Sequence, residues 1–90
     1  MEIRVEFFGI PRQRAGQPDA AICLAVPATL GALLQELGQQ FPGLEGECIE
    51  RGALQPGYLA SLGGERFISD RSEMIAEGTS VLILSAEAGG

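Results

Sequence analysis

The sequence predicts an α+β fold in which one amphipathic helix packs across a mixed sheet of four to five strands. Three observations support this prediction. The first residues alternate between charged and apolar side chains, a helical period follows, and the second half holds further apolar runs that glycines separate. A chain of 90 residues forms one domain with a modest core. We place that domain at residues 1–84 and expect residues 85–90 to form a flexible tail that ends in Gly-Gly.

The first half is expected to begin with two strands. Ile3, Val5 and Phe7 alternate with other side chains, which is typical of a strand with one buried face. Residues 9–18 contain two prolines and two glycines, so they are expected to form a loop. Residues 21–26 form a short apolar run that ends at a proline, and this run predicts the second strand.

The helix is predicted from apolar residues at the spacing i, i+3, i+4, i+7 and i+11, which places them on one face. These residues are Leu30, Leu33, Leu34, Leu37 and Phe41. Thr29 is well placed to cap the first turn, and Pro42-Gly43 ends the helix. Gly31 and Gly38 each weaken a helix by about 1 kcal/mol relative to alanine. The leucine stripe must therefore be held by packing against a sheet.

The second half is expected to add three strands. Residues 44–57 form a long acidic connection, with a short helix expected near residues 47–52. Two glycines between residues 58–62 and 65–68 indicate a hairpin, and residues 80–84 form a strong final strand. With the helix as a crossover, the last strand can lie parallel beside the first. This is the β-grasp (ubiquitin-like) arrangement, and a sandwich with another strand order is the alternative.

Composition narrows the possible functions. The formal net charge is −6 and every basic residue is arginine, so binding to nucleic acid or to an anionic membrane is disfavoured. The chain has no histidine, and its two cysteines form no C-x-x-C pair, so we predict no metal site and no dithiol motif. Cys23 lies in an apolar run and is expected in the core. Cys48 lies among glutamates that would raise its pKa if it were exposed, so it too is interpreted as structural.

The segments that suggest a family lie mainly at the two ends. The sequence opens with IRVEFFG, continues into a helix that contains TLGALLQEL, and closes with IAEGTSVLILSAEAGG. The chain resembles the MoaD/ThiS family, which includes the small subunit of molybdopterin synthase and the thiamine sulfur carrier. Ile75, Gly78 and Val81 match the late motif of that family, whereas Thr79 replaces its aspartate. Ser85-Ala86 stands where molybdopterin-type members tend to have two prolines.

The resemblance implies a sulfur carrier that works through its C-terminal Gly89 and Gly90. An E1-like adenylyltransferase (MoeB/ThiF type) would use ATP to form the Gly90 acyl-adenylate, and a sulfur donor would convert it to a thiocarboxylate. The chain itself would bind no cofactor and act as a carried reactant rather than as an independent catalyst. The acceptor implied is the large subunit of molybdopterin synthase. Because residues 1–9 lack the long apolar region of a signal peptide, we expect a cytoplasmic protein.

Four residues are expected to contact partner proteins. Phe8 and Leu84 alternate out of phase with the buried side chains of their strands, so they should lie on the outer face of the sheet. Phe67 is expected to join them from the hairpin, and the resemblance adds Ala88 in the tail. The alternative for the three larger side chains is packing under the long loop. The other functions considered are thiamine-type or other sulfur transfer, a ubiquitin-like protein tag, and a non-conjugating interaction module.

Overall fold

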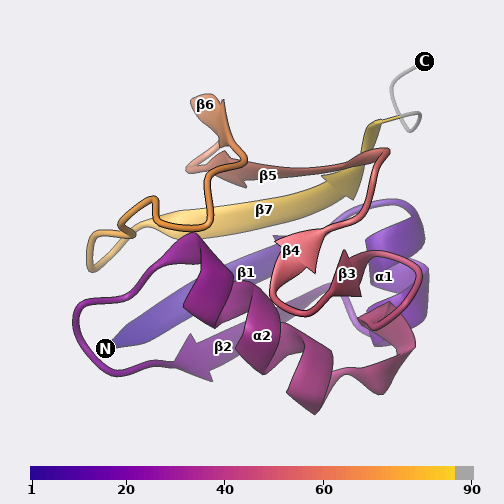
Figure 1. Cartoon of the computed structure of the whole chain (residues 1–90), viewed down its shortest axis with the longest axis horizontal. Helices are drawn as coiled ribbons and strands as arrows, with labels where there is room; N and C mark the ends of the chain where they lie inside the picture. Colours follow the sequence, from indigo (N-terminus) through magenta and orange to yellow (C-terminus); the bar gives the residue numbers. More distant parts are fainter. Residues whose placement is uncertain (87–90) are drawn as a thin grey trace.

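A computed structural model describes residues 1–86 of the chain (Figure 1). In chain order the elements are β1 (Glu2–Phe7), α1 (Ile10–Ala15), β2 (Asp19–Cys23), α2 (Leu30–Gln40), the 3-10 turn η1 (Pro42–Leu44), β3 (Ile49–Glu50), β4 (Ala53–Leu54), β5 (Tyr58–Leu62), β6 (Arg66–Ile68) and β7 (Ser80–Ser85). No helix within residues 1–86 is long and apolar enough to cross a membrane.

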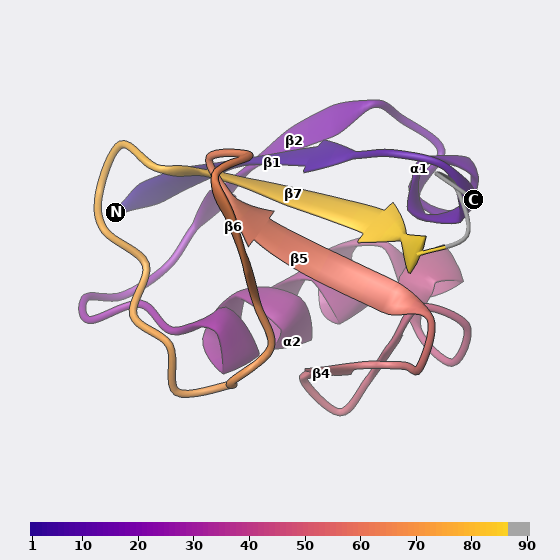
Figure 2. The ribbon, with the colours of Figure 1, turned by 90° about the horizontal axis from the view of Figure 1, so that it is seen from above.

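Five strands form the main sheet in the order β2-β1-β7-β5-β6. The first and last strands pair in parallel at the centre, and the other neighbours are antiparallel. The α2 helix lies across one face of this sheet, as the two views show (Figures 1 and 2). This arrangement confirms the β-grasp prediction, including the parallel pairing of the first and last strands.

The core lies between α2 and the sheet. The four leucines of the predicted stripe are almost fully buried, and β1 and β7 contribute alternate side chains from the facing layer. Phe41 is half-buried just after α2, and its ring meets that of Phe7 edge to face at 5.6 Å. Thr29 caps α2 as predicted, because its hydroxyl accepts a hydrogen bond from the Ala32 amide at 3.2 Å.

The segment predicted as a loop at residues 9–18 contains α1. Pro11 is at the start of this helix, where the backbone amide would have no partner within the helix, so its absence costs nothing. The fixed φ of proline also suits the first turn. Gly16 ends the helix with φ of 81°, in the left-handed region that glycine adopts readily. The same proline and glycine that indicate a loop therefore also fit the two ends of a short helix.

The second strand begins two residues before the predicted start and ends at Cys23. Its register is set by antiparallel pairing with β1, where Ile22 faces the core opposite Ile3. Because adjacent side chains in a strand point to opposite faces, Cys23 is exposed. The prediction that Cys23 belongs to the core is therefore wrong.

The prediction of a short helix near residues 47–52 is also wrong, because these residues belong to a small hairpin of β3 and β4. Its two connecting residues, Arg51 and Gly52, have φ of 52° and 75°. Two central residues with positive φ match the tight turns that join antiparallel strands. By contrast, the hairpin of β5 and β6 is confirmed, with Ala60 opposite Ile68.

Candidate functional site

The outer face of the sheet, on the side away from α2, carries an apolar surface that we call the docking face. One row begins at Phe8, which follows β1, and continues through Leu84 of β7 to its partner Leu59 of β5. A second row runs across Leu82 of β7 and Phe67 of β6, which both lie beside the same serine of β5. The docking face thus consists of Phe8, Leu59, Phe67, Leu82 and Leu84.

The exposed fractions of these side chains agree with an outward position. Phe8 is 41% exposed and Phe67 is 64% exposed, whereas Leu84 is half-buried. The alternate residues of β7, Val81 and Ile83, are fully buried toward α2, as predicted. An exposed apolar patch of this kind is typical of a protein interaction site. The structure therefore places three of the predicted partner-binding residues on one face.

Sequence reasoning missed Leu59 as a member of the docking face. Its position follows from its pairing with Leu84 in the antiparallel β5–β7 ladder. The sequence of β5, YLASL, does not alternate between apolar and polar residues, so it gave no signal for this position before the register with β7 was known.

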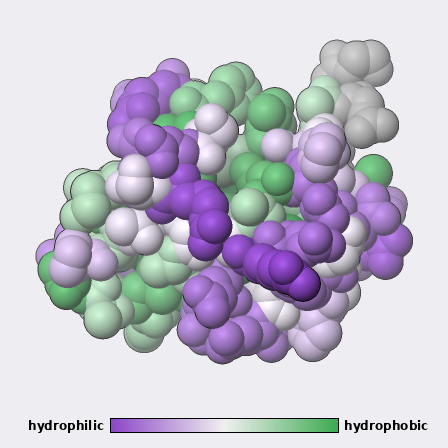
Figure 3. Space-filling model, in the orientation of Figure 1, coloured by the Kyte–Doolittle hydropathy of each residue, from purple (hydrophilic) through white to green (hydrophobic). Residues whose placement is uncertain are grey.

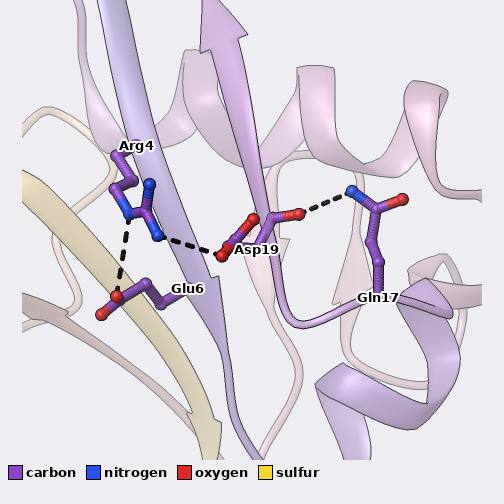
Figure 4. A network of polar contacts seen from close by, with 4 residues as sticks. All are labelled: Arg4, Glu6, Gln17 and Asp19. Atoms are coloured by element: carbon purple, nitrogen blue, oxygen red, sulfur yellow. Dashed lines mark hydrogen bonds and ion pairs between the residues drawn. The ribbon is translucent and has the colours of Figure 1, made fainter.

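Polar contacts border the docking face on the β2 side. Arg4 of β1 contacts the Asp19 carboxylate of β2 at 3.0 Å and the Glu6 carboxylate at 3.7 Å (Figure 4). The Gln17 amide donates a hydrogen bond to the main-chain oxygen of Asp19 at 2.6 Å. These groups are largely exposed, so they contribute little to stability but give the apolar surface a polar rim.

The end of β7 fixes the point from which the C-terminal segment continues. Ser85 is buried and pairs with Tyr58, and the Ala86 amide donates a hydrogen bond to the Gly57 carbonyl at 2.6 Å. The strand thus extends to Ser85, one residue beyond its predicted end and into the segment predicted as a tail. This end of β7 lies beside α1 (Figure 2). The predicted site residues Ala88, Gly89 and Gly90 lie outside the described residues.

A hydrogen-bonded group supports the end of β7 from the β5 side. The Tyr58 hydroxyl donates to the Glu47 carboxylate at 2.7 Å, and that carboxylate also contacts Arg14 of α1 at 3.5 Å. The hydrogen bond to Glu47 is the main reason that the pKa of Tyr58 is raised well above its ordinary value, because ionised tyrosine would face the carboxylate as a second anion.

Cys48 lies in the core beside this group. Its thiol is fully buried, and burial is the main cause of its raised pKa, with the Glu47 charge contributing in the same direction. A buried thiol with a raised pKa is a poor nucleophile. This environment agrees with the interpretation of Cys48 as a structural residue. The main cause of its raised pKa is burial rather than the neighbouring glutamates. Across residues 1–86, no three His, Cys, Asp or Glu side chains gather as metal ligands would.

The β-grasp sheet, its apolar outer face and the central last strand define a ubiquitin-like protein. The model of the ThiS family matches residues 5–90, and the chain belongs to this family. No curated protein sequence matches the chain. The chain is therefore a ThiS-family protein with the ubiquitin-like β-grasp fold.

Solved structures show the same fold. SAMP1 from Haloferax volcanii is 22% identical, with a TM-score of 0.84 and complete coverage of both chains. The HVO 2177 protein from Haloferax volcanii is 28% identical, with a TM-score of 0.80 over 100% of this chain and 87% of that one. A chain of the Amycolatopsis orientalis BexX/CysO complex is 17% identical, with a TM-score of 0.73 over 98% of this chain and 99% of that one.

Proposed function

We propose that this chain is a sulfur carrier whose Gly90 carboxylate is activated by an E1-like adenylyltransferase and then carries sulfur as a thiocarboxylate. The observation on which the proposal rests is the position of the end of β7. The central strand of the sheet delivers its last residue beside α1, at the Phe8 and Leu84 end of the docking face. A partner that covers this face would therefore receive the terminal glycines close to its own surface.

The proposed chemistry needs little from the chain beyond its terminal carboxylate. The carboxylate attacks the α-phosphorus of ATP and releases pyrophosphate, which leaves a Gly90 acyl-adenylate. Hydrosulfide then attacks the acyl carbon and displaces AMP, and loss of a proton leaves the Gly90 thiocarboxylate. Glycine suits this role because it lacks a Cβ, so Gly89 and Gly90 fit a narrow channel. ATP is bound by the partner, and a cytoplasmic location would supply it.

The length of the tail limits how far the activating site can lie from the sheet. Four residues follow Ala86, the last residue described, and four extended residues span at most about 14 Å. The partner must therefore contact the domain itself while its reaction centre accepts Gly90. This requirement supports Phe8 and Leu84 as docking residues, because they lie at the end of β7. Phe67 would extend the contact farther along the same face, and Ala88 would lie inside the partner channel.

The acceptor proposed for the sulfur is a large subunit of the molybdopterin synthase type. This choice is supported by the resemblance to the family that includes the small subunit of molybdopterin synthase, because Ile75, Gly78 and Val81 match the late motif of that family. Thr79 and Ser85-Ala86 are the two places where the chain departs from the pattern of that group. Transfer to another acceptor, such as one for thiamine, is the competing outcome.

Intact mass measurement tests the proposal directly. Incubation with an E1-like activating enzyme, ATP and sulfide should raise the mass of the chain by about 16 Da, as sulfur replaces oxygen. A variant that lacks Gly90 is the control, and it should keep the fold and show no change in mass. If the full chain also keeps its mass with an enzyme that thiolates another ThiS-family protein, the carrier proposal is wrong. A mass increase that corresponds to linkage with a second protein would instead indicate a modifier.

A further inference from the structure

The turn that precedes β5 holds the last residue that the structure describes. Gly57 lies in this turn with φ of 92°, in the region that glycine adopts readily, and its carbonyl accepts the hydrogen bond from the Ala86 amide at 2.6 Å. The next residue, Tyr58, pairs with Ser85 at the end of β7. A shift of this turn would therefore detach Ala86 from the sheet and move the point from which the C-terminal segment continues.

Residues on both sides of Gly57 fasten this turn to the segment between η1 and β3. On one side, the Gln55 amide donates a hydrogen bond to the Cys48 carbonyl at 2.8 Å. On the other side, the Tyr58 hydroxyl donates a hydrogen bond to the Glu47 carboxylate at 2.7 Å. The residue that holds the end of β7 is thus fixed between two anchors, which both lead to neighbouring residues of the same segment.

The anchor between Tyr58 and Glu47 depends on side chains, whereas the other anchor joins main-chain groups. Tyr58 is only 9% exposed, so its ring is packed in the domain and its hydroxyl has a defined position. A hydrogen bond to an ionised carboxylate is stronger than one between neutral groups. The second oxygen of Glu47 contacts Arg14 at 3.5 Å, and because both of these side chains are largely exposed, this long contact adds little. The hydroxyl–carboxylate bond is therefore the side-chain contact that fixes the turn.

This anchor lies on the other side of the sheet from the docking face. Tyr58 lies on the same side of β5 as Ala60, which is fully buried toward α2, while Leu59 between them points to the docking face. Hydrophilic side chains cover the corner of the molecule where α1 and β3 lie (Figure 3). A partner that covers the apolar docking face need not contact the Tyr58 hydroxyl, so an effect of this hydroxyl on the reaction must be transmitted through the position of Ala86.

We propose that Tyr58 and Glu47 are positioning residues for the C-terminal segment. Their hydrogen bond holds Gly57 in place, and Gly57 holds Ala86 at the end of β7. The consequence for the reaction rests on the proposed function. Because only four residues follow Ala86, a displaced starting point would bring Gly90 to the reaction centre less often. Docking itself should not change, since it involves the other face of the sheet.

Amide hydrogen exchange of the full 90-residue chain tests the first step without any partner. In Tyr58→Phe, the Ala86 amide should exchange about three- to ten-fold faster than in the unsubstituted chain, because a hydrogen bond to a charged acceptor is lost. The Leu24 amide is the internal reference, since it donates to the Met1 carbonyl at 2.8 Å at the opposite end of the sheet. Its exchange should not change. The proposal is overturned if the Ala86 amide is unaffected, or if both amides change by the same factor.

Two substitutions of Glu47 identify the contact. Glu47→Gln keeps an oxygen that can accept the bond from Tyr58, so it should retain most of the protection of the Ala86 amide. Glu47→Ala removes the acceptor and should speed exchange at Ala86 as much as Tyr58→Phe does. The double variant Tyr58→Phe/Glu47→Ala should exchange no faster than Tyr58→Phe, because both changes remove the same bond. Additive effects would show that the two side chains act separately, which would contradict the proposal.

ATP–pyrophosphate exchange with an E1-like activating enzyme tests the second step. Tyr58→Phe should lower kcat about three-fold or more and leave KM nearly unchanged, because the docking face is intact. Ser72→Ala is the matched control, since it also removes a hydroxyl that donates to a carboxylate at 2.7 Å, that of Asp70, and it should change neither constant.

The two steps fail in different ways. A raised KM with unchanged kcat in Tyr58→Phe, or an unchanged kcat despite faster exchange at Ala86, would overturn the positioning role. If the unsubstituted chain is not adenylated at all, the proposed function fails, and the hydrogen-exchange comparison still decides whether Tyr58 and Glu47 position Ala86.

Discussion

Truncation of the two docking-face phenylalanines should weaken binding to the proposed E1-like activating enzyme by different amounts. A phenylalanine side chain that is fully covered buries roughly 150–250 Å² of surface. With 64% of Phe67 exposed, a partner can cover at most about 100–160 Å² there, which corresponds to about 2–4 kcal/mol at roughly 25 cal/mol per Å². With 41% of Phe8 exposed, the same estimate gives about 1.5–2.5 kcal/mol. Phe67→Ala should therefore weaken binding more than Phe8→Ala.

The assay is ATP–pyrophosphate exchange with an E1-like activating enzyme and the chain as the varied substrate. Both variants should raise KM and leave kcat nearly unchanged, because contacts on the docking face are the same before and during adenylation. The free energy of unfolding of Phe67→Ala should change little, since most of that side chain is already in water in the free protein.

Val26→Ala is the matched control for these two variants. Val26 is 74% exposed in the loop between β2 and α2, outside the docking face. Its truncation should leave KM unchanged. The reasoning is refuted if Val26→Ala raises KM as much as Phe67→Ala, or if Phe67→Ala has no effect while the unsubstituted chain is adenylated normally.

Three further predictions concern the described domain. In the native chain a maleimide should label Cys23 and leave Cys48 unlabelled until urea unfolds the protein; mass spectrometry would count the labels, and equal labelling would contradict the burial of Cys48. Gly43→Ala should destabilise the domain by about 1–3 kcal/mol in urea unfolding, because the new Cβ would meet a main-chain carbonyl of α1; an unchanged midpoint would contradict this. Hydrogen bonds from Ser72 lower the pKa of Asp70, so they stabilise the fold above the ordinary carboxyl pKa, and this stability is lost as the pH falls from about 4 through the lowered value. The difference in urea midpoint between the unsubstituted chain and Ser72→Ala should thus be present at pH 7 and vanish in acid; a difference that persists in acid would have another cause.

The main elements could be predicted from the sequence because each buries one face along its whole length. The leucine stripe of α2 and the alternation in β1 and β7 hold over several turns or residue pairs, so local pattern and tertiary burial agree. The short elements lack this redundancy. Pro11 and Gly16 fit a loop and the ends of α1 equally well, and the turn at Arg51 required a positive φ that arginine does not indicate.

Part of the docking face could be predicted for the same physical reason, and one member was missed for a different reason. Alternation alone assigns Phe8 and Leu84 to the outer side, since their neighbours are apolar and must be buried. The position of Leu59 depends on which strands become neighbours, and the register of β5 with β7 decides this. The exposure of Cys23 likewise follows from register, because its run of apolar neighbours gives no alternation to read.

The limited reach of the tail couples the docking face to the proposed reaction. Because Ala86 is tied to Gly57, a channel that receives Gly90 must open within about 14 Å of the end of β7. Phe8 and Leu84 lie at this end of the sheet, so a partner cannot accept the terminal glycines without approaching them.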